Sequence, residues 1–140
     1  MTARNISYAQ NAEDVRVWRA FADLPSQRGL VYVDVGANEP VHLSITASLS
    51  ELGWGGLLIE ADPELAADLR VHRPRDRVVE AAAAAGDGTL TFYRVPGTGL
   101  GTLDATEADA ARTRGFDVEA VDVPTMSLDR ILDEQDLGDI

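Results

Sequence analysis

The sequence predicts an α/β fold with a mostly parallel sheet, and three observations support this. Residues 30–35 form a short apolar run rich in valine, which is typical of a buried parallel strand. A Gly-Ala-Asn turn at residues 36–38 follows, and a helical pattern comes next. A second apolar run, residues 56–60, lies one helix later and ends in the acid Glu60. Strand, helix and strand in this order form the repeating unit of an open parallel sheet.

Length and composition predict one globular domain. A chain of 140 residues with 45% hydrophobic and 26% charged residues can bury a core of its own. The net charge of −12 argues against a nucleic-acid partner, because nucleic-acid binders carry a basic surface. The chain has no cysteine and no acid or histidine spacing typical of a metal site, so we expect neither a disulfide nor a metal centre.

The start of the chain gives no sign of a targeting segment. Residues 1–5 lead into polar residues, and no apolar stretch approaches the roughly 20 residues that a membrane span requires. We therefore expect a cytoplasmic protein without a signal peptide and without a membrane partner.

Helical spacing of apolar residues predicts the first two helices. The apolar residues between 15 and 24 indicate one helix of about four turns, with Trp18 and Phe21 packed on the sheet. A second is expected from about Pro40 to Leu52, ended by Gly53. The N-terminus of the second helix would point at the Gly-Ala-Asn turn, as a cofactor-binding unit requires.

The middle of the chain predicts one more helix and two more strands. Asp62 is the expected cap of the third helix. Residues 77–82 are predicted to form a third parallel strand with an alanine-rich end. A turn at residues 86–88 leads to an alternating strand over residues 89–95. The inward-facing residues of the third helix are expected to be Leu65, Ala66, Leu69 and Val71.

The last third of the chain begins with a glycine-rich loop, residues 96–103, which lacks the lysine of a phosphate-binding loop. An exposed acidic helix is expected over residues 105–114, and a strand with one wet face over residues 116–123. Ser127 caps a final helix, and residues 138–140 resemble the beginning of another strand. The inward-facing residues of that helix are expected to be Leu128, Ile131 and Leu132.

The predicted turn and strand ends fit a nucleoside cofactor. In an open α/β sheet the ligand lies at the carboxyl ends of the strands, and Gly36 would let it approach the backbone. Glu60 lies 24 residues after Gly36, which suits a carboxylate that binds ribose hydroxyls. The further glycines of a dehydrogenase turn are missing, and Asp34 would repel a pyrophosphate but attract a sulfonium and an α-amino group. The pattern favours a methyl donor over a dinucleotide.

Several other residues allow both a structural and a functional interpretation. His42 is a candidate substrate contact, but a lone histidine is more often a packing or surface residue, and His72 is a weaker candidate. The polar run over residues 10–14 fits a capped, solvated helix start, and Ala82 fits either a wall for a planar ring or close packing. The glycine-rich loop fits a mobile substrate loop or a plain surface loop. No Ser/His/Asp order or nucleophile elbow appears, so no catalytic residue is assigned.

Six segments together resemble the FkbM-type family of class I S-adenosylmethionine-dependent O-methyltransferases, many of which act on sugar or polyketide hydroxyls. The resemblance covers nearly the whole chain. The segments are Ser7 to Asp14, Val33 to Asn38, Pro40-Val41 with Ser44 and Thr46, Gly53 to Gly56, Ile59 to Pro63, and Gly97 to Leu100.

The resemblance implies a Rossmann-like class I methyltransferase fold, a three-layer sandwich with a mostly parallel sheet. It implies that Asp34, Gly36 and Asn38 line the methionine end of S-adenosylmethionine, that Glu60 holds the ribose, and that residues 10–14 fold over the pocket. Asp62 and Ala82 would lie near the adenine. The expected cofactor-binding residues are Gln10, Asn11, Glu13, Asp14, Asp34, Gly36, Ala37, Asn38, Glu60, Ala61, Asp62 and Ala82. The candidate substrate contacts are His42, Thr98 and Leu100.

The chain departs from the family pattern in two places. Family members continue past the equivalent of Ile140 with a strand that carries an Asp-x-Glu-Gly motif, and they tend to have asparagine where this chain has Glu80. We therefore expect residues 1–140 to be the amino-terminal part of the family domain, truncated after the third sheet strand and an inserted β-hairpin region.

Three functions follow as hypotheses. The first is an O-methyltransferase that moves a methyl group to a hydroxyl of a sugar, polyketide or related small metabolite. The second is a non-catalytic S-adenosylmethionine-binding or assembly module, because a sheet cut at this point exposes a central strand edge that a second copy or a partner chain would complete. The third is a nicotinamide-dependent oxidoreductase.

Overall fold

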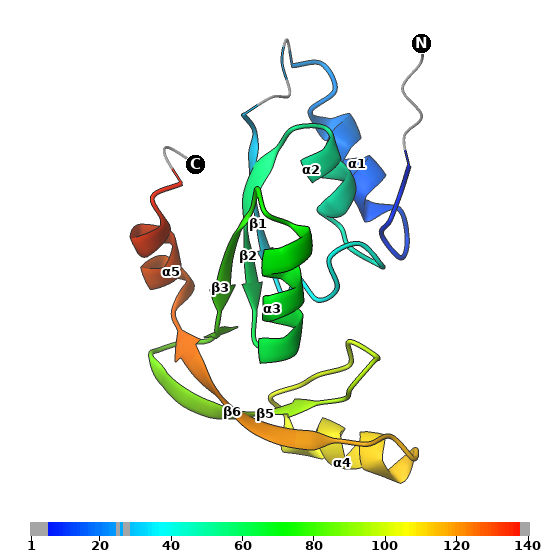
Figure 1. Cartoon of the computed structure of the whole chain (residues 1–140), viewed down its shortest axis with the longest axis vertical. Coiled ribbons are helices and arrows are strands. Elements are labelled where there is room, and N and C mark those ends of the chain that lie inside the picture. Colours follow the sequence, from blue (N-terminus) through cyan, green and yellow to red (C-terminus); the bar gives the residue numbers. More distant parts are fainter. Residues whose placement is uncertain (1–5, 25, 27–28, 138–140) are drawn as a thin grey trace.

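The computed structural model of the chain describes residues 6–24, 26 and 29–137. Two three-stranded sheets and five helices make up this part of the chain (Figure 1). The first sheet is parallel, with the order β1 (Val31–Val35), β2 (Gly55–Glu60) and β3 (Arg77–Glu80). The second sheet has the order β4 (Ala82–Ala83), β6 (Glu119–Met126) and β5 (Gly88–Arg94). The helices are α1 (Glu13–Ala20), α2 (Ala47–Glu51), α3 (Pro63–His72), α4 (Ala105–Thr113) and α5 (Leu128–Gln135).

Helices cover both faces of the parallel sheet, which makes this part of the fold three-layered (Figure 1). On one face Leu58 of β2 packs with Leu69 of α3 and Leu49 of α2. On the other face Leu57 and Ile59 pack with Ile131 of α5. Alternate residues of β2 thus face two separate apolar clusters, as the short apolar run predicts for a strand buried on both sides.

The edge position of β1 corrects the prediction that this strand is buried. Within the described residues, β1 pairs only with β2, so its other edge is open. Val31 is 40% exposed and Val35 is 53% exposed, whereas Tyr32 packs into the core. The ring of Tyr32 lies against Gly56, where any Cβ atom would be 2.0 Å from the ring. Glycine at this position therefore lets β1 and β2 pack closely.

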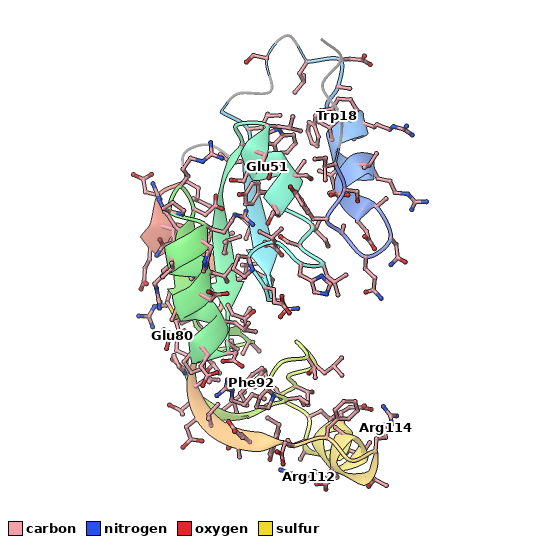
Figure 2. The ribbon with its side chains drawn as sticks, turned by 45° about the vertical axis from the view of Figure 1, so that its right-hand side comes forward. Trp18, Glu51, Glu80, Phe92, Arg112 and Arg114 are labelled. Carbon is pink, nitrogen blue, oxygen red and sulfur yellow. The ribbon has the colours of Figure 1, made fainter. Side chains whose placement is uncertain are left out.

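The second sheet extends away from the first one and carries α4 at its far end (Figures 1 and 2). The chain passes from one sheet to the other at Ala81, whose N–H still donates to the carbonyl of Glu60. Arg112 of α4 stacks on the ring of Tyr93 of β5 at 5.7 Å. β6 begins at Glu119 rather than at the predicted residue 116, because the N–H of Phe116 closes the end of α4 on the carbonyl of Ala111.

Two predicted helices are shorter than expected. α1 has eight residues and ends at Ala20; Phe21 then turns its ring edge-on to Trp54, with the ring centroids 5.3 Å apart. α2 has five residues and begins at Ala47 instead of Pro40. Gly53 ends it as predicted, with a backbone φ of 95°. The N-terminus of α2 therefore starts too late to point at the turn after β1.

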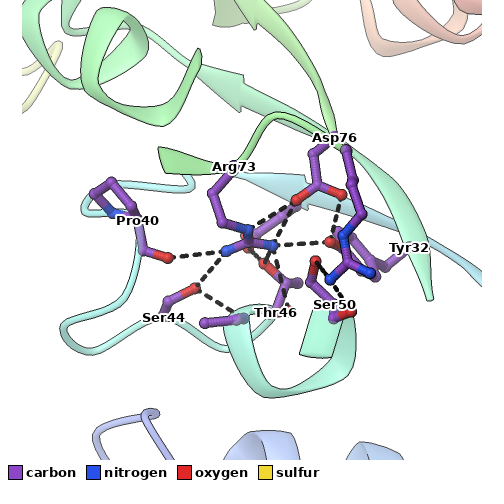
Figure 3. A network of polar contacts seen from close by, with 10 residues as sticks. Tyr32, Pro40, Ser44, Thr46, Ser50, Arg73 and Asp76 are labelled. Carbon is purple, nitrogen blue, oxygen red and sulfur yellow. Dashed lines mark hydrogen bonds and ion pairs between the residues drawn. The ribbon is translucent and has the colours of Figure 1, made fainter. Parts of the chain in front are cut away.

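Arg73 explains why residues 40–46 are not helical. Its buried guanidinium donates hydrogen bonds to the carbonyl of Pro40 at 3.0 Å and to the hydroxyl of Tyr32 at 2.8 Å, and it pairs with Asp76 at 2.7 Å (Figure 3). Leu43 has a left-handed backbone with φ 58°, which no helix accommodates. The side chain of one arginine, from the end of α3, thus takes the place of helical hydrogen bonds.

Other predictions have mixed outcomes. Asp62 and Ser127 cap α3 and α5 as predicted, because their side chains accept the N–H groups of Glu64 and Arg130. The prediction that Val71 and Leu128 face inward is wrong, because Val71 is 70% exposed and Leu128 is exposed as well. The predictions for residues 1–5 and 138–140 lie outside the described residues. In the part of the chain that is described, no helix is both long and apolar enough to span a membrane.

Candidate functional site

A cavity of about 500 Å³ lies at the carboxyl ends of β1 and β2, between the parallel sheet and β5. The segment from Ala81 to Ala83 forms one wall, and the glycine-rich loop after β5 forms another. The structure brings to this cavity the following predicted site residues: Gly36, Asn38, Glu60, Ala61, Asp62, Ala82 and Thr98. Their position agrees with the rule that ligands lie at the carboxyl ends of parallel strands.

Glu60 is fixed in the cavity wall by two backbone groups. One carboxylate oxygen accepts the N–H of Asn38 and the other accepts the N–H of Asp62, both at 2.8 Å. Glu60 is only 5% exposed. This burial raises the pKa of its carboxyl, and the hydrogen bonds from the two N–H groups oppose the rise. Each oxygen can accept one more hydrogen bond, so this carboxylate can bind a pair of ligand hydroxyls.

The turn after β1 brings its backbone close to β2. The N–H groups of Gly36 and Ala37 both donate to the carbonyl of Ile59, at 2.8 and 3.2 Å. Gly36 and Asn38 have left-handed backbones, with φ 75° and 59°. The side-chain oxygen of Asn38 is buried without a hydrogen-bond partner among the described residues. A buried acceptor without a partner favours binding of a ligand that donates a hydrogen bond to it.

Arg94, which sequence reasoning missed, joins the second sheet to the start of α3 at the cavity. Its side chain is 10% exposed and pairs with Asp62 at 3.1 Å, with Glu119 at 3.2 Å and with Glu64. The bonds to Glu64 and Asp62 raise the pKa of this guanidinium further. The alternation of β5 contains the missed signal, since Arg94 shares the buried side of that strand with Phe92, two residues earlier.

The glycine-rich loop is exposed to solvent on one side and lines the cavity on the other. A Cβ atom at Gly99 would be 2.4 Å from the side-chain nitrogen of Asn38, and one at Gly101 would be 2.2 Å from the ring of Phe92, which Figure 2 labels. Thr98 donates its hydroxyl to the carbonyl of Val95 at 2.7 Å and lines the cavity. Leu100 is 57% exposed and does not line the cavity, although its neighbours Gly99 and Gly101 do, and its contact with substrate stays a prediction.

The amino-terminal segment does not fold over the cavity, which corrects the prediction for Gln10, Asn11, Glu13 and Asp14. Ala9 instead forms a bridge with Leu43, in the loop that precedes α2. Gln10 is exposed, and Glu13 bonds to the backbone and side chain of Asn11, both at 2.9 Å. This part of the chain therefore covers α2 rather than the carboxyl end of β2.

Asp14 stabilises that arrangement as a completely buried carboxylate. It accepts hydrogen bonds from the hydroxyls of Ser7 and Ser48 and from the N–H groups of Tyr8 and Val15, at 2.7 to 2.9 Å. Burial raises the pKa of Asp14, but these four bonds outweigh burial and hold the pKa below its ordinary value. All four acceptor positions of the carboxylate are occupied, so Asp14 has a structural role. It borders a separate cavity of about 220 Å³, whose lining includes Trp18 and Glu51. Figure 2 labels these two side chains.

Asp34, Ala37 and His42 also lie outside the main cavity, contrary to prediction. Asp34 accepts the hydroxyl of Thr46 at 2.8 Å, and burial raises the pKa of its carboxyl. Ala37 packs in the core with Tyr32, and His42 is exposed in the loop that Arg73 holds. Residues in and near the turn thus divide between the cavity, which Gly36 and Asn38 line, and the fold around it, to which Asp34 and Ala37 contribute.

The cavity is strongly acidic. Five carboxylates line it, those of Glu39, Glu60, Asp62, Glu64 and Asp68, together with one guanidinium, that of Arg94. Such a wall attracts a cationic ligand and repels a pyrophosphate. Among the residues that the structure describes, no group of three histidines or acids is placed to hold a metal ion.

Comparison with known proteins gives one match. A family model described as the methyltransferase FkbM domain matches residues 34–140, a span that begins within β1 and includes the residues around the cavity. No curated protein and no solved structure matches the chain.

We expect Gly99→Ala to destabilise the protein more than Gly97→Ala does. Both glycines have left-handed backbones, with φ 66° and 73°. Alanine is strained in this conformation, so both variants should lose a similar amount of stability from backbone strain. Only the new methyl at residue 99 meets the side chain of Asn38, which should add about 1 to 3 kcal/mol to the loss. Urea unfolding measures the difference, and equal losses in the two variants would show that the loop does not press on Asn38.

We expect Asp14→Asn to lower the free energy of unfolding by about 2 to 4 kcal/mol at neutral pH, because an amide cannot accept four hydrogen bonds. The pKa of Asp14 is lower in the folded state than the ordinary 3.8, so its contribution is complete above about that pH. The contribution decreases as the pH falls through the folded-state pKa.

Urea unfolding at pH 7, 5 and 3 tests this dependence, with Asp133→Asn as the control because Asp133 is exposed on α5. The gap between wild type and Asp14→Asn should be smallest at pH 3. A gap that stays constant over this range would rule out the ionised carboxylate as its source.

Proposed function

Because the chain belongs to the FkbM methyltransferase family, we propose that it binds S-adenosylmethionine and transfers a methyl group to a hydroxyl of a small metabolite, such as a sugar or a polyketide. The observation that carries this proposal is Glu60. Its carboxylate is buried at the carboxyl end of β2, it is oriented by two N–H groups, and it lines the cavity. A carboxylate in this position is the usual partner of the ribose hydroxyls of a nucleoside cofactor.

The residues around the cavity fit this cofactor. Glu60 has free acceptor positions for two hydroxyls, and the buried oxygen of Asn38 lacks a donor. The small side chains from Ala81 to Ala83 leave a wall against which a planar ring can lie. The excess of carboxylates suits a ligand with a sulfonium and an ammonium group, and it disfavours the pyrophosphate of a nicotinamide cofactor.

The contribution of the chain to the reaction is mainly positioning. When bound, S-adenosylmethionine supplies an electrophilic methyl group on a positively charged sulfur. Glu60 and Asn38 would orient the nucleoside, and Thr98 from the glycine-rich loop would contact the acceptor. Phe92, Val95 and Leu103 give the cavity an apolar side that reduces access of water to the reacting groups.

We expect wild-type protein to bind S-adenosylhomocysteine in a calorimetric titration and NAD not at all. Glu60→Gln should weaken S-adenosylhomocysteine binding by at least about tenfold, because an amide cannot accept two backbone N–H groups and two hydroxyls. Glu80→Gln is the matched control: Glu80 pairs in register with Glu60 on β3 but lies outside the cavity. Unchanged affinity in Glu60→Gln would contradict the ribose assignment, and binding of NAD alone would favour an oxidoreductase.

The open edge of β1 favours a second candidate, a binding or assembly module that a further chain completes. Among the described residues β1 has one strand neighbour, and Val31 and Val35 are exposed on it. Unpaired edges of this kind bind additional strands.

If a second copy pairs with β1, light scattering after size exclusion should give the mass of a dimer or larger species. Val31→Lys should return the protein to a monomer, because a charged residue on an edge strand opposes pairing. A wild-type protein that remains a monomer at high concentration would contradict self-assembly through β1.

A further inference from the structure

Four of the five carboxylates around the cavity already have partners. Asp62 and Glu64 pair with Arg94, and Asp68 lies 2.8 Å from the imidazole of His72. Glu60 accepts two backbone N–H groups, as described above. Asp62, Glu64 and Asp68 therefore each have a side-chain partner, and Glu60 is oriented by the backbone toward ligand hydroxyls.

Glu39 is the exception. It lines the cavity and is half-buried, and no hydrogen bond or ion pair joins it to any described residue. A carboxylate at a cavity wall without a partner keeps all of its acceptor positions available to a cationic group of a ligand. Glu39 is thus the carboxylate of this cavity that is best suited to meet a positive charge.

The position of Glu39 in the turn identifies which part of a nucleoside ligand it meets. It directly follows Asn38, whose N–H donates to Glu60, so the backbone next to Glu39 is fixed relative to the ribose-binding carboxylate. When a carboxylate at the end of the second strand holds the ribose, the 5′ substituent of the nucleoside lies at the turn after the first strand. In S-adenosylmethionine that substituent carries the sulfonium and the α-amino group.

We propose that the carboxylate of Glu39 binds the cationic amino-acid end of S-adenosylmethionine. This inference rests on the function proposed above. The sequence assigns the same role to Asp34, but Asp34 is outside the cavity and is bonded to Thr46. Glu39 takes over that role because it follows the turn and faces the cavity, whereas Asp34 lies within β1.

Two ligands with the same nucleoside test the proposal. S-adenosylmethionine has the charged amino-acid end, and 5′-methylthioadenosine has neither this end nor a positive charge. Calorimetric titration of Glu39→Gln should show about tenfold weaker binding of S-adenosylmethionine, with the affinity for 5′-methylthioadenosine within about twofold of wild type. Added salt should weaken S-adenosylmethionine binding less in Glu39→Gln than in wild type, because the variant lacks the charge.

Two further variants are controls. Glu107→Gln makes the same charge change on the exposed side of α4, and it should leave both affinities unchanged. Asp34→Asn should alter both affinities by the same factor, because Asp34 bonds to Thr46 and does not line the cavity, so its loss would affect both ligands only through a change in the surrounding structure. An unchanged affinity for S-adenosylmethionine in Glu39→Gln would overturn the proposal, and so would an equal loss for both ligands. A wild-type protein that binds 5′-methylthioadenosine but not S-adenosylmethionine would instead contradict the methyl-donor function, and the role of Glu39 with it.

Discussion

The structure around the cavity depends on the carboxylate of Glu60. Its two oxygens accept N–H groups from both of its neighbours in space, the turn after β1 and the start of α3. These bonds fix the end of β2 relative to the end of β1 and orient the carboxylate toward the cavity. Glu60 is buried and charged, so it needs these partners, and a ligand that adds hydroxyl donors would stabilise it further.

The strand β2 and the starts of α3 and α5 could be predicted from the sequence because their causes are local. The apolar run of β2 and the capping side chains of Asp62 and Ser127 act within a few residues. Residues 40–46 could not be predicted in this way. Their apolar spacing matches a helix, but the guanidinium of Arg73, about thirty positions later in the chain, binds the carbonyl of Pro40 and keeps this segment out of α2 (Figure 3).

The site could be predicted where chain position alone decides which side chains meet. Gly36 and Glu60 end neighbouring parallel strands, so they must lie at the same edge of the sheet. The roles of Asp14 and Asp34 could not be predicted, because their hydrogen-bond partners, Ser48 and Thr46, lie in distant segments. These two acids support the fold, whereas Glu39, one residue beyond the turn, lines the cavity and has no hydrogen-bond or ion-pair partner among the described residues.

The central claim is that the cavity at the ends of β1 and β2 holds a nucleoside through Glu60. The most direct test is a crystal structure of the protein grown with S-adenosylhomocysteine. We predict that both ribose hydroxyls lie within hydrogen-bond distance of the Glu60 carboxylate, with the amino-acid end at the turn that contains Asn38. A ligand bound elsewhere, or one whose ribose does not contact Glu60, would contradict this account.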